Sequence, residues 1–331
     1  MTITFGRSAA LSGRTVLCWL AVAPGAGWAV VRLAGLDRGP LVQMLAFTPY
    51  ALLGSLIPLV LAVALRRRWP AAVAAVTTVA LLAAVVPRAL PAPQPTVDGP
   101  ELRVLTANLL AGAADPRAVV ALVRDARVDV LVVQEFTPQA RTELDRLGLT
   151  DLLPHRQLNP MDGTPGSGLY ARHPIGDGGV RQLRGGWSFT QAYATVAVPG
   201  APTVRVESVH PAAPYAVDQV PGWRADLAAQ PAATPDGPLG ILAGDFNATL
   251  DHGPLRALLR TGYVDAAASV GAGLTGTWGP YDGDPIPPVV IDHVLVDRRI
   301  AVRAVEVHPL PGSDHRMVLA DLRLPSAPHR M

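Results

Sequence analysis

Long apolar runs occupy the first part of this 331-residue chain, and short apolar runs with polar punctuation occupy the rest. No charged side chain falls within residues 41–65 or 69–87. A helix of roughly 20 apolar residues crosses the hydrocarbon core of a bilayer. We therefore predict transmembrane helices over about 41–65 and 69–87. A third apolar stretch, about 16–33, contains one proline and two glycines, so the membrane region 1–88 holds two to three spans.

Charge flanking these runs predicts how they are oriented. Arg66, Arg67 and Arg68 separate the apolar runs 41–65 and 69–87, and such clusters are typical of cytoplasmic loops. The chain after Arg88 is then outside the cytoplasm, which predicts a multi-pass cell-membrane protein with an extracytoplasmic C-terminal part. The alternative for residues 16–31 is the core of a signal peptide, although no polar mature start follows it.

The region that follows begins with repeated prolines and then changes to the pattern of a layered domain. Four prolines between residues 87 and 95 favour a stiff, extended linker over 89–100. Strands and helices then alternate over 101–324, which predicts a single α/β domain followed by a short tail, 325–331. The expected strands are 102–107, 128–134, 167–172, 190–198, 204–210, 239–243, 289–296, 301–307 and 317–322, and the expected helices are 115–127, 139–146, 222–229 and 253–260.

Composition narrows the chemistry. Residues 1–100 carry a formal charge of +6 and residues 101–331 carry −4, so the basic balance of the chain lies outside the α/β domain. Net charge therefore does not predict a strongly cationic nucleic-acid surface there. The chain has one cysteine, Cys18, which excludes an intrachain disulfide and any zinc site built from cysteines.

Polar side chains recur at the ends of the expected strands. Carboxylate and amide oxygens without thiolates suit a hard divalent ion such as Mg²⁺ or Mn²⁺. Histidines can donate hydrogen bonds to phosphoryl oxygens as negative charge develops, and an aspartate can orient and deprotonate water. Any one of these residues could simply be a solvated or turn-capping residue, but their ordered occurrence at successive strand ends indicates a site. Its members are Asn108, Glu135, His210, Asp245, Asn247, Asp292, His293, Asp314 and His315.

Several short strings around these residues resemble one family. Residues 101–324 are similar to the endonuclease/exonuclease/phosphatase superfamily, which includes deoxyribonucleases, apurinic-site endonucleases, neutral sphingomyelinases and inositol-polyphosphate phosphatases. The order of the strings along the chain is far more specific than any one of them. The strings are Leu-Thr-Ala-Asn108, Val-Val-Gln-Glu135, Ser-Gly-Leu-Tyr-Ala-Arg172, Ser-Val-His210, Gly-Asp245-Phe-Asn247, Ile-Asp292-His293 and Gly-Ser-Asp314-His315.

The resemblance implies a fold and a role for each position. The fold is a four-layer α/β sandwich, in which two packed mixed sheets carry helices on both outer faces. Glu135 is then the principal metal ligand, with Asn108 beside it and Asp314 close to the metal. The remaining roles concern the reacting groups: water activation by Asp245, phosphate binding by Asn247 and His210, transition-state or leaving-group stabilisation by His210 and His315, and pairing of His315 with Asp292.

Two positions depart from the family pattern. No acid that would orient His210 is identifiable, and Glu207 on the preceding strand is the available candidate. His293 follows Asp292 where several relatives carry an aromatic or aliphatic residue, so the resemblance gives it no role.

These observations predict a membrane-anchored hydrolase of phosphodiester bonds that depends on Mg²⁺ or Mn²⁺ and is nuclease-like. Its partners are a phosphodiester substrate, nucleic acid or phospholipid, and the lipid bilayer. An activity on phospholipid or sphingolipid, or a phosphatase activity of the same superfamily, is the alternative. A hypothesis of a different class is a tethered binding module without catalysis, but that would predict a missing member of the catalytic set, and all members are present.

Overall fold

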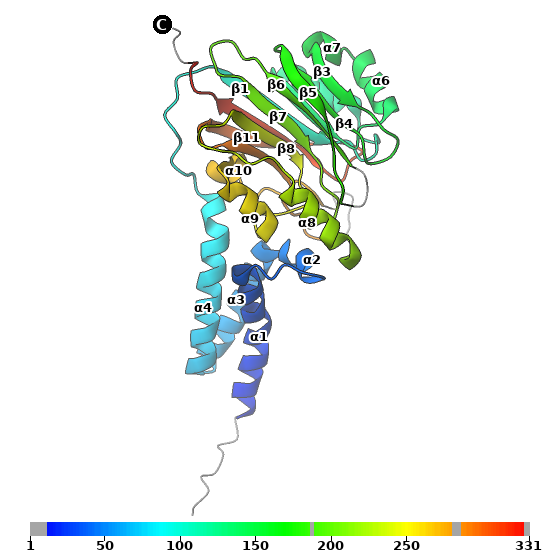
Figure 1. Ribbon diagram of the computed structural model, residues 1–331. Helices are drawn as coiled ribbons and strands as arrows, with labels where there is room; N and C mark the ends of the chain where they lie inside the picture. The colour runs from blue at the N-terminus through cyan, green and yellow to red at the C-terminus, as the bar shows by residue number, and fades with distance from the viewer. Residues whose placement is uncertain (1–11, 186–188, 280–285, 328–331) are drawn as a thin grey trace, which may run out of the picture. The chain divides into compact units, whose positions relative to one another are not determined.

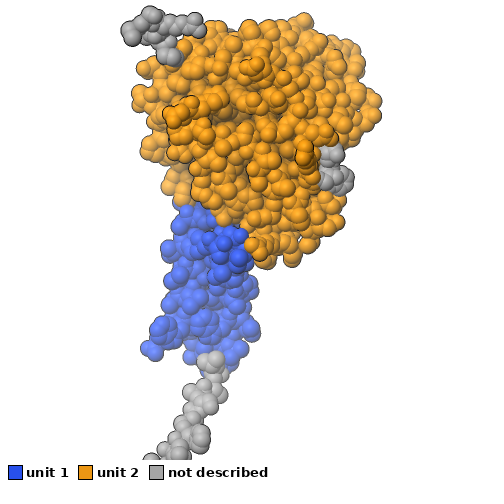
Figure 2. All heavy atoms as spheres, in the orientation of Figure 1, with its two compact units in different colours: residues 1–36, 47–86 blue, residues 37–46, 87–331 orange. Residues whose placement is uncertain are grey.

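A computed structural model describes residues 12–185, 189–279 and 286–327. The chain divides into two compact units, coloured separately in Figure 2. Unit 1 comprises residues 1–36 and 47–86, and unit 2 comprises residues 37–46 and 87–331. The sequence pattern placed residues 37–46 in the membrane region, whereas in the structure they group with the α/β domain.

Unit 1 consists of three apolar helices: α1 (Gly13–Ala34), α3 (Thr48–Ala64) and α4 (Arg68–Val85), the last followed by the short 3-10 helix η1 (Val86–Ala89) that leads into unit 2. Two segments are long and apolar enough to cross a membrane, namely Gly13–Ala34 and Arg68–Ala89, while α3 is shorter. The apolar run at 41–65 is not one helix. It is divided into α2 (Leu41–Leu45) and α3, and Pro49 in the first turn of α3 supplies the break because it has no N–H to continue a preceding helix.

Unit 2 is a four-layer sandwich of two six-stranded mixed sheets, as expected (Figure 1). The first sheet has the order β11-β12-β1-β2-β4-β3 and the second β5-β6-β7-β8-β10-β9. The first sheet contains β1 (Glu101–Asn108), β2 (Val130–Gln134), β3 (His155–Asn159), β4 (Ser167–Ala171), β11 (Ala301–Pro309) and β12 (Arg316–Arg323). The second contains β5 (Ile175–Gln182), β6 (Thr190–Val196), β7 (Val204–Val209), β8 (Leu239–Asp245), β9 (Tyr263–Asp265) and β10 (Asp292–Asp297).

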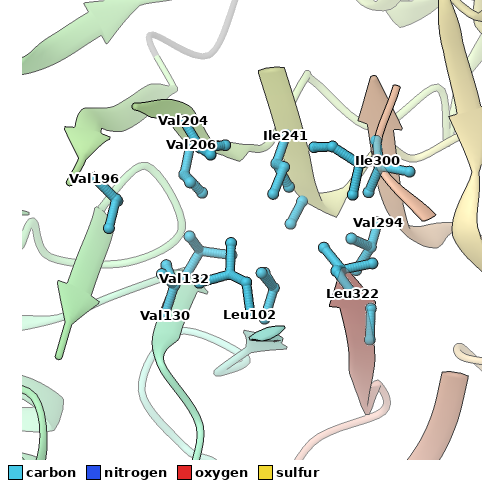
Figure 3. Packing of buried hydrophobic residues seen from close by; sticks show 14 of the residues in the cluster. Leu102, Val130, Val132, Val196, Val204, Val206, Ile241, Val294, Ile300 and Leu322 are labelled. Carbon is cyan, nitrogen blue, oxygen red and sulfur yellow. The ribbon is translucent and has the colours of Figure 1, made fainter. Parts of the chain in front are cut away.

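The core between the sheets follows from strand alternation. Leu102 of β1, Val206 of β7 and Ile241 of β8 point inward and are fully buried (Figure 3). Val104 of β1 is fully buried in the same cluster. Because successive side chains of a strand face opposite sides, Leu105 of β1 points to the outer face. Aliphatic side chains from both sheets thus form one continuous apolar layer.

Helices cover the outer apolar faces. The helices α5 (Pro116–Asp125), α6 (Pro138–Arg146) and α7 (Leu149–Leu152) pack on the first sheet. The helices α8 (Val220–Ala228) and α9 (Gly253–Arg260) pack on the second, preceded by η2 (Val217–Gln219), and α10 (Ala266–Ser269) follows β9. Trp223 of α8 and Leu255 of α9 are fully buried there, together with Val42 of α2. The short α2 is therefore part of the core of this unit.

The proline-rich segment is not a free tether. Ala92 donates its N–H to the carbonyl of Ser269, and Gln94 accepts a hydrogen bond from the main-chain N–H of Val302. Gly99 bonds in the same way to the carbonyl of Leu324. The expectation that residues 89–100 form a linker separate from the apolar helices and the α/β domain is therefore wrong. The prolines favour an extended backbone, and this extended segment is hydrogen-bonded to unit 2 and belongs to it.

Candidate active site

Sheet topology brings the strand ends together. In the first sheet β1 pairs with β2 in parallel and with β12 in antiparallel fashion. In the second, β7 pairs with β8 in parallel and β10 with β8 in antiparallel fashion. The carboxyl ends of both parallel pairs and the amino ends of β10 and β12 therefore meet at one edge of the sandwich. That edge holds the polar side chains that the sequence singled out.

The two sheets contribute matching sets. Asn108 ends β1, Glu135 follows β2 and His315 precedes β12, whereas His210 follows β7, Asp245 ends β8 and Asp292 begins β10. Below them, Gln134 donates from its Nε2 to the Oγ of Ser208 on the other sheet, at 2.9 Å. This buried polar link joins the sheets where the apolar core ends.

Asn108 connects the carboxylates of the two sheets. Its Nδ2 donates to Glu135 Oε1 at 3.2 Å and to Asp245 Oδ2 at 3.1 Å. Its Oδ1 accepts the main-chain N–H of Leu110 at 3.0 Å, which fixes the amide in that orientation. Glu135 also accepts the N–H of Ala111 at 2.7 Å, and burial raises the pKa of the Glu135 carboxyl.

The turn after β8 explains the Gly-Asp-Phe-Asn string. A Cβ on Gly244 would lie 2.0 Å from the carbonyl oxygen of Val209, so only glycine fits beside β7. Asn247 has a φ of 48°, a left-handed conformation that asparagine tolerates. Its N–H donates to Asp245 Oδ1 at 2.8 Å, and its Nδ2 donates to the carbonyl of Pro211 at 3.1 Å. Glu135 is likewise left-handed, with a φ of 53°, so two of the predicted site residues occupy sparsely populated backbone conformations.

His315 forms a charged pair with Asp292. Its Nδ1 donates to Asp292 Oδ2 at 2.9 Å, and its Nε2 lies 3.7 Å from Asp245 Oδ2. Burial opposes the positive charge, but Asp292 and Asp245 outweigh it and raise the pKa of His315 to about 10. Burial also raises the pKa of Asp245 to about 7, against the opposing charge of His315.

His210 lies in a different environment. Its ring stacks on Phe189 with centroids 4.5 Å apart, and its Nε2 lies 3.8 Å from Asp245 Oδ2 and 4.0 Å from Glu135 Oε1. Its Nδ1 is buried without a hydrogen-bond partner among the described residues. Burial, followed by the charge of His315, lowers the pKa of His210 to about 3. His210 is therefore a neutral imidazole.

Glu207 does not orient His210. Its carboxylate accepts hydrogen bonds from Arg181 at 2.7 Å and Gln191 at 2.8 Å instead. The suggestion that Glu207 pairs with the His210 ring is therefore wrong: Glu207 lies within β7 and faces these two side chains.

Asp314 adjoins the central cluster, because its Oδ1 lies 3.9 Å from His315 Nε2, whereas His293 lies outside it. Asp314 Oδ2 accepts a hydrogen bond from Trp278 Nε1 at 2.8 Å, while its buried Oδ1 has no hydrogen-bond partner among the described residues. His293 points to the outer side of the sheet, where its Nδ1 donates to Asp265 at 2.7 Å and its Nε2 donates to the carbonyl of Ala248 at 2.9 Å. It thereby holds the turn that carries Asn247.

Sequence reasoning missed three supporting residues. Thr277 accepts the main-chain N–H groups of Ile291 and Asp292 with its Oγ1, at 3.1 and 3.0 Å. Trp278 orients Asp314, and Phe189 supports His210. None of these follows an apolar strand, so the strand-end pattern that located the others could not find them.

Comparison with known proteins agrees with this arrangement. The profile of the Endonuclease/Exonuclease/phosphatase family matches residues 105–315. The chain belongs to this family. No curated protein matches the chain.

Solved structures share the fold. An endonuclease/exonuclease/phosphatase from Beutenbergia cavernae DSM 12333 is 22% identical, with a TM-score of 0.56 over 69% of this chain and 73% of that one. Humanized D. rerio TDP2 is 15% identical, with a TM-score of 0.55 over 67% and 99%. D. rerio TDP2 in complex with a single-strand DNA product is 14% identical, with a TM-score of 0.52 over the same shares. At these identities the likeness concerns the fold.

Proposed function

We propose that this protein is a membrane-anchored, divalent-metal-dependent phosphodiesterase. The observation that carries the proposal is the convergence of Asn108, Glu135 and His315 from one sheet with His210, Asp245 and Asp292 from the other. A cation site, a buried base and two histidines around one edge are what hydrolysis of a phosphate ester requires.

Glu135 and Asp314 would hold Mg²⁺ or Mn²⁺, with Asn108 beside them. The donor set fits: both are carboxylates, and Asp314 Oδ1 is a buried oxygen without a hydrogen-bond partner among the described residues. The Asn108 oxygen already accepts the Leu110 N–H, so in this arrangement Asn108 supports the carboxylates through its Nδ2. When bound, the ion supplies positive charge to the substrate phosphate and the leaving oxygen.

A second group of potential ligand atoms lies on Asp245, Asp292 and His315, all within 4.8 Å of one another. We assign it a different role. The Nδ1 of His315 is bonded to Asp292, and its Nε2 faces Asp245, so this ring is placed to hold and move a proton. The three form a proton-handling group.

Within that group Asp245 is the proposed base. The N–H of Asn247 fixes its Oδ1, which leaves Oδ2 facing the two histidines. A carboxyl whose pKa is raised to about 7 by burial is well matched to accept a proton from water near neutral pH. Asp245 would take the proton as the water oxygen bonds to phosphorus and the ester oxygen leaves.

The two histidines would stabilise the charge that develops. His315, held as an imidazolium by Asp292, would donate from Nε2 to a phosphoryl oxygen or to the leaving oxygen. His210 would donate a hydrogen bond as a neutral ring, and Asn247 would steady the phosphate. A preorganised donor contributes up to roughly 10²- to 10³-fold to the rate, and a charged donor contributes more than a neutral one.

The membrane part of the proposal rests on α1, α3 and α4. Residues 37–46 and 87–331 belong to one unit, so they lie on the same side of the bilayer. If the helices between them span the bilayer, the chain crosses it and returns, and Arg66, Arg67 and Arg68 would lie at the cytoplasmic turn. The helix α1 would be a third span, because Gly13–Ala34 is long and apolar enough to cross a bilayer and ends just before residues 37–46.

Nucleic acid is the first substrate class to test, since a structural relative was solved with a single-strand DNA product. Phospholipid is the second, because apolar helices would hold the site beside lipid head groups. Incubating the full-length protein with labelled DNA and with mixed lipid vesicles in parallel, and identifying the released products, separates the two classes.

The test of the activity itself uses full-length protein in detergent and bis-p-nitrophenyl phosphate. We expect hydrolysis with Mg²⁺ or Mn²⁺ that EDTA abolishes and that the double variant Asp245→Ala, His315→Ala lowers by at least about 10²-fold. Glu143→Gln on the exposed face of α6 is the control, and it should retain wild-type activity. Stoichiometric ligand binding without turnover would instead support the tethered binding module.

A further inference from the structure

The exposed large apolar side chains of unit 2 are unevenly distributed. Among the described residues, four of the six lie beside the two places where this unit continues into the apolar helices. They are Tyr215 (64% exposed) and Val217 (54%) at one place, and Leu90 (56%) and Leu274 (42%) at the other. The other two are Val180 and Ile286. Clustered exposed apolar residues mark contact surfaces.

The first place is the connector between α1 and α3, residues 37–46. Gln43 donates from Nε2 to the carbonyl of Pro214 at 2.5 Å, directly before Tyr215. A Cβ on Gly39 would contact Val217 at 3.9 Å. The connector is thus bonded to the segment 211–219, which begins immediately after His210.

The second place is the start of unit 2 after α4. Arg88 forms two hydrogen bonds with Asp251, at 2.7 and 2.5 Å, and both side chains are buried. The carbonyl of Arg88 accepts the N–H of Gly273, next to Leu274. The exposed side chain of Leu90 follows two residues after Arg88.

Residues 249–253 of unit 2 are hydrogen-bonded to both regions, the connector 37–46 and Arg88. Next to Asp251, the His252 ring donates from Nε2 to the carbonyl of Val42 at 2.8 Å, and the N–H of Gly253 donates to Asp37 at 2.9 Å. Residues 249–253 follow closely after Asn247. Both loops that carry the proposed chemistry on the second sheet therefore continue into the segments that hold the connector and Arg88.

Chain length limits how far these places can lie from a bilayer. A fully extended chain spans at most about 3.6 Å per residue. Arg88 is three residues beyond the end of α4 at Val85, and the connector fills the short interval between α1 and α3. If α1, α3 and α4 span the membrane, the apolar side chains at both places lie at its surface.

We propose that Tyr215, Val217, Leu90 and Leu274 form a lipid-facing rim, with which the catalytic unit rests on the bilayer. This inference rests on the membrane anchoring in the proposed function. Aromatic and aliphatic side chains on a surface-lying segment bury favourably at the head-group boundary. In residues 37–46, 88–90, 211–219 and 273–274 the exposed charged residues are Arg38 and Asp218, whose charges cancel. The proposed contact with lipid is therefore apolar rather than electrostatic.

The experiment uses full-length protein reconstituted in phosphatidylcholine vesicles. Cys18 is the chain's one cysteine, so Cys18→Ala gives a background for single-cysteine variants labelled with bimane. We expect doxyl-labelled lipid to quench the label several-fold more in Tyr215→Cys and Leu274→Cys than in Val180→Cys, which is exposed on β5. The difference should persist in 0.5 M salt, where the Debye length is about 4 Å and attraction between surface charges is largely screened.

Equal quenching at residues 180, 215 and 274 would overturn the rim. Hydrolysis of bis-p-nitrophenyl phosphate by the same labelled proteins reports separately on the proposed function and on folding. Active variants without selective quenching would reject the rim and leave the phosphodiesterase intact. An inactive wild type with selective quenching would reject the phosphodiesterase and leave the rim.

Discussion

The two histidines of the candidate active site come from opposite sheets and lie in different electrostatic environments. His315 is bonded to Asp292 and carries a positive charge, whereas His210 is stacked on Phe189 and is neutral. Both nevertheless point an Nε2 toward the same oxygen of Asp245, at 3.7 and 3.8 Å. Similar positions in the sandwich thus provide one charged and one neutral donor. The side chains around a histidine at a strand end therefore decide whether it is charged.

The largest effect should come from the group that both histidines face. Asp245→Asn keeps the shape but removes the base, so we expect kcat to fall by about 10³-fold, within the range for a lost base. Steady-state hydrolysis of bis-p-nitrophenyl phosphate at saturating Mn²⁺ measures it. Glu143→Gln, which changes an exposed carboxylate on α6 paired with Arg146, is the control. Equal rates for Asp245→Asn and wild type would remove Asp245 from the chemistry.

Replacing the histidines one at a time should expose their difference. We expect His315→Gln to lower kcat by about 10²- to 10³-fold and His210→Gln by about tenfold to 10²-fold, because a charged donor stabilises developing negative charge more than a neutral one. Circular dichroism checks that both variants fold. A larger loss for His210→Gln would reverse the assignment.

The pH dependence should separate the charged side from the neutral side. The rate should rise with pH as Asp245 loses its proton, around pH 7, and should fall only as His315 deprotonates, around pH 10. Asp292→Asn removes a carboxylate that raises the pKa of His315, so the alkaline limb should move to lower pH. The profile of kcat against pH measures both limbs. An unchanged alkaline limb in Asp292→Asn would show that this pair does not set it.

The smallest effect should come from the apolar support of His210. Phe189→Leu removes the stacked ring but not the charged pair on the other sheet. We expect kcat to fall only a few-fold, since an aromatic pair contributes about 0.5–1.5 kcal/mol beyond its buried area. The acid limb of the profile should not move. A loss as large as that of His315→Gln would mean that the neutral side is the more important one.

The sequence predicted which polar side chains would meet at one edge better than it predicted the residues that support them. Glu135, Asp245 and His315 were located because each adjoins a strongly apolar strand, and parallel pairing then brings such ends together. The edge strands β3 and β5 were not expected. His155–Asn159 and Ile175–Gln182 are polar or glycine-containing, so their pairing depends on neighbouring strands rather than on an apolar pattern.

The apolar N-terminal region shows the same limit of sequence-based prediction. The apolar run from residue 41 reads as continuous, but Val42 is buried against α8 and α9 of unit 2 rather than in a helix with α3. Hydrophobicity alone does not distinguish a side chain that packs in a domain from one that faces lipid. The hydrogen bond from His252 to the Val42 carbonyl, which the sequence could not predict, helps to hold Val42 in unit 2.

In the proposed mechanism, Glu135 helps to bind a divalent ion beside Asp245 and the two histidines. The most direct test is the Mn²⁺ concentration dependence of bis-p-nitrophenyl phosphate hydrolysis by wild type, Glu135→Gln and Glu143→Gln. We predict saturable activation of wild type and Glu143→Gln along one curve, and a shift to at least about tenfold higher Mn²⁺ for Glu135→Gln. Coincident curves for all three proteins, or hydrolysis that persists in EDTA, would contradict the account.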